Sequence, residues 1–127
     1  MNRIRGPRYL LAALLAFVVA VPFTLAEPKG KNITASGELV DMWCYYEGGD
    51  HGPSHKACAT ACAKLGNPIG LLRKNGQVYV LAGMQDHQPA KDVLVNHMSE
   101  MVTVKGTLVS KGGGNMLYVT SVSPKSK

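Results

Sequence analysis

The segment T-A-S-G-E-L-V at Thr34–Val40 and the segment T-V-K-G-T-L-V at Thr103–Val109 share one spacing of threonine, glycine, leucine and valine. In each segment a glycine, Gly37 or Gly106, interrupts a run of residues typical of a β-strand. Glycine inside a strand indicates a bulge or a tight bend, because no side chain obstructs a close backbone approach. The two segments therefore predict two long strands that each bend, as the strands of a small closed barrel must.

The rest of the chain adds three predicted strands and two predicted helices. Two short apolar runs are joined by Lys74-Asn75-Gly76, and Asn-Gly between such runs is the strongest local signal of a hairpin. A second hairpin is expected around the glycine-rich segment 111–115. The expected strands are 33–45, 69–73, 77–82, 101–110 and 116–123, and the expected helices are 54–65 and 90–98.

This order of elements predicts a mainly β, OB-fold-like barrel of five strands. The helix at 54–65 lies in the connection after the first strand and carries cysteines and a histidine. The helix at 90–98 lies between the third and fourth strands, as it does in OB folds.

The N-terminal residues have the pattern of an export signal. Arg3, Arg5 and Arg8 precede an apolar run at Tyr9–Phe23 and small residues that end at Ala26. The run is shorter than the roughly 20 apolar residues that a membrane span needs, so we expect cleavage after Ala26 and no stable membrane span afterwards. We predict a periplasmic or secreted protein. Its predicted organisation is a signal peptide at 1–26, a linker at 27–32, one OB-like domain at 33–123 and a disordered tail at 124–127.

Cleavage of this segment changes the charge of the protein. The three arginines are removed with it, so the formal net charge falls from +6 to +3. Most of the remaining excess lies in the linker and the tail, where Lys29, Lys31, Lys125 and Lys127 are found. Domains that bind nucleic acids carry a concentrated basic surface, so we expect no nucleic-acid partner.

All three cysteines lie in the segment C-Y-Y-E-G-G-D-H-G-P-S-H-K-A-C-A-T-A-C at Cys44–Cys62. His55, Cys58 and Cys62 are spaced i, i+3 and i+7, so they share one face of the predicted helix. Cys44 is expected to approach this face from an extended segment. Thiolate and imidazole are preferred ligands of zinc, and thiolates favour Cu(I). We therefore predict a transition-metal site of Cys44, His55, Cys58 and Cys62, with His51 as a substitute for His55.

Two alternatives stay open at this point. In an oxidising compartment Cys44 could form a disulfide with Cys58 or Cys62, worth about 2–4 kcal/mol, in an interaction module for an envelope partner or ligand. A thiol-disulfide redox protein is the enzymatic alternative, although its usual C-x-x-C motif is absent. No Ser-His-Asp order or phosphate-binding glycine loop is found, and we otherwise predict no enzyme.

Four neighbours of Cys44 have two interpretations each. Trp43, Tyr45 and Tyr46 could stack on nucleic-acid bases, as aromatic residues of OB folds do. The weak charge instead favours packing in the core or in the wall of the site. Asp41 is interpreted as an ordinary exposed strand acid, and the alternative is that it orients or neutralises a ligand.

The chain also resembles a group of small exported bacterial proteins of OB-like build. The resemblance rests on G-E-L-V-D-x-x-C-Y from Gly37 and on G-x-x-H-x-x-C-A-x-x-C-A-x-x-G-x-P-I-G-L-L from Gly52. It covers roughly residues 37 to 123 and is strongest up to Leu72. It implies a compact extracytoplasmic domain with a Cys/His cluster, and it implies no particular activity.

Overall fold

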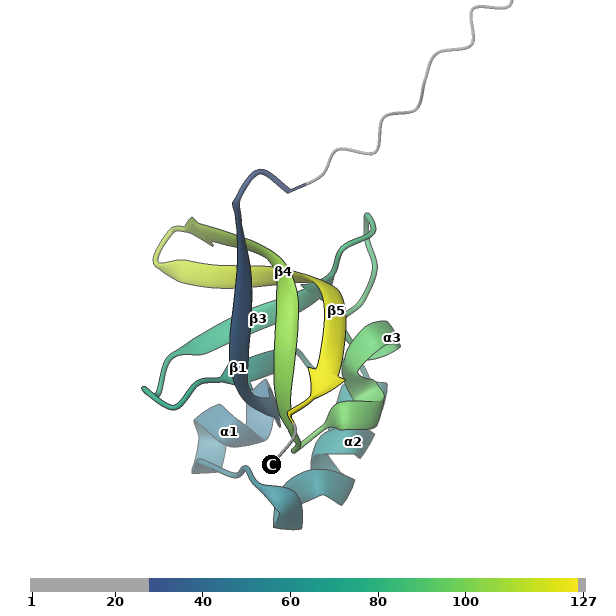
Figure 1. Cartoon of the computed structure of the whole chain (residues 1–127). Coiled ribbons are helices and arrows are strands. Elements are labelled where there is room, and N and C mark those ends of the chain that lie inside the picture. The colour runs from purple at the N-terminus through teal and green to yellow at the C-terminus, as the bar shows by residue number, and fades with distance from the viewer. Residues whose placement is uncertain (1–27, 126–127) are drawn as a thin grey trace, which may run out of the picture.

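The computed structural model describes residues 28–125, so the predicted signal peptide at 1–26 lies outside the described residues. Five strands form a closed barrel in the order β1-β2-β3-β5-β4, and β4 pairs again with β1 (Figure 1). All neighbouring strands are antiparallel except β3 and β5, which are parallel. This is the strand order of an OB fold, and it confirms the predicted five-stranded OB-fold-like barrel.

The positions of the helices also agree with the prediction, since helices follow β1 and β3. The strands are β1 (Lys31–Asp41), β2 (Ile69–Leu72), β3 (Val78–Gly83), β4 (Met101–Lys111) and β5 (Gly114–Pro124). The α-helices are α1 (Met42–Gly48), α2 (Lys56–Lys64) and α3 (Lys91–Leu94), and the 3₁₀ turns are η1 (Pro53–His55) and η2 (Val95–His97).

The two glycine-containing strands, β1 and β4, are antiparallel neighbours in the barrel. A Cβ atom on Gly106 would lie 2.0 Å from the carbonyl oxygen of Tyr118, and the pairing of β4 with β5 shifts register at Lys105/Gly106. A Cβ atom on Gly37 would lie 2.4 Å from the carbonyl oxygen of Leu72. Just beyond Gly37, β1 exchanges its partner β4 for β2. Both glycines therefore permit the close strand approach that closes the barrel.

Aliphatic side chains from the strands fill the barrel, and α2 packs against this core. Ala59 and Ala63 of α2 are fully buried, and their small side chains allow the helix to approach the barrel closely. α1 and α2 lie together at the end of the barrel where β1 ends (Figure 1). Fully buried strand residues include Leu39, Ile69, Leu71, Val102, Val104 and Leu117.

The first strand is shorter than predicted, because β1 ends at Asp41 and the chain turns directly into α1. Asp41 is the N-cap of α1, and its carboxylate accepts a hydrogen bond from the backbone N–H of Cys44 at 3.0 Å. Gly49 ends the helix in the left-handed conformation, with φ of 77°. These two capping signals outweigh the alternating pattern that suggested a strand up to Tyr45.

Three further boundaries differ from the prediction. The predicted helix 54–65 is divided into η1 and α2, with Pro53 at the first position of η1. The predicted helix 90–98 consists of the single turn α3 followed by η2. The second hairpin turns more tightly than predicted, at Gly112 and Gly113, and both glycines have positive φ. In addition, β5 extends to Pro124, which was expected in the tail, because Pro124 still pairs with Val102 of β4.

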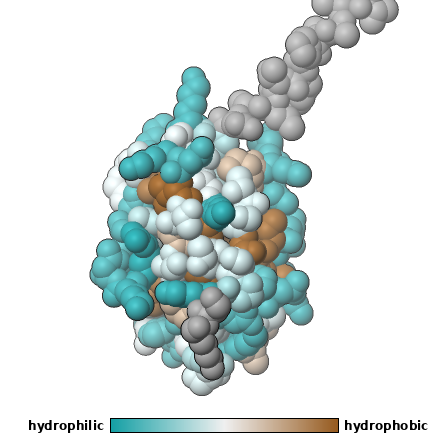
Figure 2. Space-filling model, viewed as in Figure 1, coloured by the Kyte–Doolittle hydropathy of each residue, from teal (hydrophilic) through white to brown (hydrophobic). Residues whose placement is uncertain are grey.

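The expected packing of aromatic residues around Cys44 is wrong for two of them. Trp43 is 66% exposed and Tyr46 is 68% exposed, because α1 lies on the surface and buries none of its residues. The face of the molecule in Figure 2 is mostly hydrophilic, with separate hydrophobic patches. Among helices of the described residues, none has the length and apolar character needed to cross a membrane.

Candidate metal centre

The four predicted ligands meet at the surface between α1 and α2. Cys44 lies in the first turn of α1, and His55 ends η1 immediately before α2 begins. Cys58 and Cys62 lie one turn apart on α2. α1 continues directly from β1 and α2 is fastened through its buried alanines, so the end of the barrel holds both helices in place.

Cys44 belongs to two groups of potential ligand atoms. In one group, the Sγ atoms of Cys44 and Cys58 and a ring nitrogen of His55 lie within 4.8 Å of one another. In the other group, the Sγ atoms of Cys44 and Cys62 and a carboxylate oxygen of Asp41 lie within the same distance of one another. With Zn–S bonds of about 2.3 Å and Zn–N bonds of about 2.0 Å, ligands of one tetrahedral zinc ion lie roughly 3.3–3.8 Å apart. The structure therefore has a Cys/His cluster that could bind a metal ion.

The cluster has a buried floor and an open side. Asp41 is 1% exposed and forms the floor, whereas Cys58 is exposed. Cys44, Cys62 and His55 are half-buried between them. An ion held here would be shielded from solvent by the barrel and reachable from the side of Cys58.

Two polar atoms of the cluster are buried without a hydrogen-bond partner among the described residues. They are Oδ1 of Asp41 and Nε2 of His55. A buried polar atom without a partner costs about 1–3 kcal/mol. Both residues belong to the donor groups around Cys44, so a cation bound through these two atoms would provide the missing interaction of each.

The electrostatics around Asp41 favour the neutral thiols of Cys44 and Cys62 in the absence of a cation. The Asp41 carboxylate beside the Cys44 thiol, together with burial, raises the pKa of Cys44 to about 12. Burial, contact with Cys58 and the charge of Asp41 raise the pKa of Cys62. Redox-active cysteines have lowered pKa values, so this environment does not favour thiol-disulfide chemistry. A bound metal ion would reverse the balance, because its positive charge stabilises thiolates.

His51 is not in either donor group. Its Nδ1 atom lies 3.1 Å from Oε2 of Glu38, and 48% of its side chain is exposed. Glu38 also accepts a hydrogen bond from the backbone N–H of Gly52. These contacts fasten the loop before η1 to β1 and hold the His51 ring beside Glu38. All three cysteines are free thiols in the structure.

Sequence reasoning missed the role of Asp41. The interpretation as an exposed strand acid is wrong, because Asp41 is buried and lies beside two thiols. One sequence signal could have indicated this position. Asp is a preferred N-cap residue, and its side chain accepts a hydrogen bond from the backbone N–H two or three residues later. In D-M-W-C, that N–H belongs to Cys44, three residues after Asp41.

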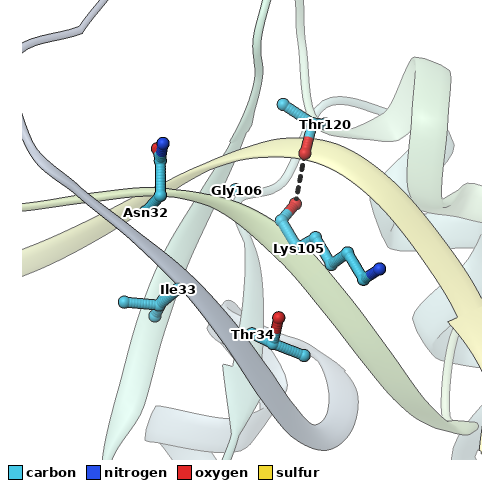
Figure 3. Close-up of a pocket in the computed structure, with 6 residues that line it drawn as sticks. All are labelled: Asn32, Ile33, Thr34, Lys105, Gly106 and Thr120. Atoms are coloured by element: carbon cyan, nitrogen blue, oxygen red, sulfur yellow. Dashed lines mark hydrogen bonds between the residues drawn. The ribbon is translucent and has the colours of Figure 1, made fainter.

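A separate depression on the barrel surface holds no comparable set of donor atoms (Figure 3). Two of the residues that line it are joined by a hydrogen bond from the Thr120 hydroxyl to the Lys105 carbonyl oxygen at 3.0 Å. It lies toward the start of β1, seven or more residues from Asp41, which is about 23 Å along a strand. The residues that line it are Asn32, Ile33, Thr34, Lys105, Gly106 and Thr120.

Comparisons with protein-family models, with curated proteins and with solved structures find no match to this chain. The fold and the site therefore define the class of the protein by themselves. It is a small OB-fold-like barrel with a Cys/His cluster, placed between two helices, that could bind a metal ion.

Proposed function

We propose that this protein is an extracytoplasmic transition-metal-binding protein that holds zinc or Cu(I) through Cys44, His55, Cys58 and Cys62. One observation supports this most strongly: the Cys44 sulfur lies within 4.8 Å of a donor atom of each of the other three residues. Thiolate and imidazole are the ligand types that zinc prefers, and thiolates also bind Cu(I). The export signal expected at 1–26 supports the extracytoplasmic location.

The site is compatible with two roles, which differ in the ion and in its exchange. A zinc ion bound by four protein ligands would be structural, since no position is left for an activated water. It would fasten α1, which buries no residue, to the well-packed α2. A Cu(I) carrier or buffer would instead use the exposed Cys58 as the side from which an acceptor approaches.

The first test is the metal and thiol content of the exported protein. It is purified without an affinity histidine tag or chelator, and zinc, copper and reactive thiols are counted. We expect about one metal ion per chain, with thiols that react only after chelation, as the linkage between metal binding and thiol deprotonation requires. Protein that holds neither ion, even after anaerobic reconstitution, and has one free thiol would contradict the proposal.

Matched variants separate the site from adventitious binding. His55→Ala removes a proposed ligand, whereas His87→Ala removes a histidine whose side chain is 91% exposed in a remote loop. Cys58→Ser removes a proposed ligand, whereas Ala61→Ser places a serine on the exposed part of the same helix. Only the first member of each pair is expected to reduce metal content.

The disulfide module is the second candidate function. The Cys44 sulfur lies close to both other sulfurs, so it could pair with either of them and leave one thiol free. In that case either Cys58→Ser or Cys62→Ser would have almost no effect on stability. If the protein binds metal, both substitutions weaken binding. The same pair of variants therefore discriminates the two functions.

A further inference from the structure

We propose that Asp41 is itself a metal ligand, together with Cys44 and Cys62, and that its carboxylate favours a zinc ion over Cu(I). This inference rests on the proposed function, because it assigns a fifth donor and the class of ion to the same cluster; a zinc ion held by all five donors would be five-coordinate and would still have no position for a water. It concerns a residue at the end of β1, a barrel strand, whereas the other ligands belong to α1, α2 and η1.

The two oxygen atoms of the Asp41 carboxylate have different surroundings. Oδ2 accepts the N–H of Cys44 at 3.0 Å and thereby caps α1. Oδ1 is buried and has no hydrogen-bond partner among the described residues. A serine or asparagine would cap a helix equally well with a single oxygen. Capping alone therefore does not account for the second oxygen, which belongs to a carboxylate that lies within 4.8 Å of two thiols.

The Asp41 carboxylate also has no ion-pair partner among the described residues. Among the described residues, the ion pairs involve Glu38, Asp86, Asp92 and Glu100, and none involves Asp41. Buried charges in proteins are normally paired or bound to metal ions. The side chains that lie within 4.8 Å of the Asp41 carboxylate in its donor group are the thiols of Cys44 and Cys62, which carry no positive charge. A metal ion between these groups would supply the positive charge.

The donor set indicates the class of ion. A carboxylate oxygen is a normal zinc ligand, with a Zn–O distance of about 2.0–2.2 Å. Cu(I) selects soft sulfur ligands and gains little from a hard carboxylate. A divalent ion also neutralises one more of the negative charges gathered from the thiolates and the carboxylate. Asp41 should therefore contribute to the affinity for zinc much more than to the affinity for Cu(I).

The test uses two variants that retain a side-chain oxygen for the helix cap, Asp41→Asn and Asp41→Ser. Zinc and Cu(I) affinities of the purified full chain are measured by competition with chelators, anaerobically, and folding is checked by circular dichroism. We expect zinc affinity to fall by more than about 100-fold in both variants, because the loss of outer-shell partners alone reduces metal affinity about 10- to 100-fold. Cu(I) affinity should change by less than about threefold, because Cu(I) binding depends on the thiolates.

A second measurement reads the carboxylate in the unmodified protein, in case the variants fold poorly. Infrared difference spectra of protein with isotope-labelled aspartate are recorded as zinc or Cu(I) is added. We expect zinc, and not Cu(I), to shift one aspartate carboxylate band. The absence of a zinc-induced shift, unchanged zinc affinity in both variants, or equal losses for the two ions would overturn the assignment of Asp41. Failure of the wild-type protein to bind either ion would instead overturn the proposed function.

Discussion

The Oδ2 atom of Asp41 accepts the backbone N–H of Cys44 at 3.0 Å, and this hydrogen bond links the barrel to the cysteine cluster. It ends β1 and begins α1, so the Cys44 thiol is turned toward α2 and not along the strand direction. The cluster is thus built on the rigid end of a barrel strand.

Cys44→Ser should be the most damaging of the three cysteine substitutions. Cys44 belongs to both donor groups, whereas Cys58 and Cys62 each belong to one. Loss of outer-shell partners alone reduces metal affinity about 10- to 100-fold, so we expect a loss above about 100-fold for Cys44→Ser. Cys58→Ser and Cys62→Ser should cause smaller losses of similar size. Chelator competition measures all three affinities, with Ala61→Ser as the control. A near-normal affinity for Cys44→Ser would contradict the shared role.

His55→Ala should weaken metal binding, and His51→Ala should not. The ring of His55 lies beside Cys44 and Cys58 with its Nε2 atom unpaired, whereas His51 contacts Glu38. Cobalt substitution measures the difference, because its visible spectrum reports the ligands and geometry of the ion. We expect the His55→Ala spectrum to change and the His51→Ala spectrum to match that of the wild type. The opposite result would make His51 the ligand.

Removal of the metal should loosen α1 while the barrel remains folded. α1 buries no residue fully, and its first turn is fastened to the barrel by the Asp41 cap and by a hydrogen bond from Met42 N–H to the Pro68 carbonyl oxygen at 3.0 Å. A metal ion bound by Cys44 would add a further attachment, to α2. We expect faster amide hydrogen exchange across Met42–Gly48 after chelation and unchanged exchange in β4 and β5. When free metal is about 100 times its Kd, bound metal adds about 2.7 kcal/mol to the free energy of unfolding. Equal exchange in the loaded and chelated proteins would contradict this prediction.

Glu100→Gln should destabilise the protein at neutral pH and have no effect in acid. Glu100 contacts the ammonium group of Lys56 at the start of α2 and lies 3.0 Å from Nδ1 of His97. Lys56 first, and then His97, lowers the pKa of Glu100 from its usual value of 4.5. Because the pKa of Glu100 is lowered in the folded state, its stabilising effect is fully present above the usual value of 4.5. This effect is lost as the pH falls from 4.5 through the lowered pKa of the folded state.

The Glu100 side chain is 34% exposed, so we expect a loss of at most about 1 kcal/mol at pH 7. Urea unfolding at pH 7 and at acid pH measures the difference between the variant and the wild type. Asp92→Asn, which disrupts the exposed pair of Lys91 with Asp92 at 3.2 Å, is the control for a surface ion pair. A difference that is the same at both pH values would show that the contact is not ionic.

The barrel was predictable because its signals are local. Gly37 and Gly106 indicate bends, because the absence of a Cβ atom permits a close approach of the neighbouring strand. Asn75-Gly76 indicates a hairpin, because Gly76 readily adopts the positive φ that the turn requires. The error at the end of β1 has a local cause as well. Val40, Met42 and Cys44 alternate as in a strand, but the Asp41 cap and Gly49 favour a short helix. The exposure of Trp43 and Tyr46 follows from that helix, since it lies on the surface.

The amino-acid sequence by itself determined that His55, Cys58 and Cys62 follow one another along one side of a helical segment, because helical geometry sets that spacing. Only the tertiary structure decided that Cys44 reaches these residues from α1 and that Asp41 lies buried beneath the thiols. Both facts depend on how β1, α1 and α2 pack at the end of the barrel. Such packing is a property of contacts between separate elements, and the spacing of residues within any one element does not specify it.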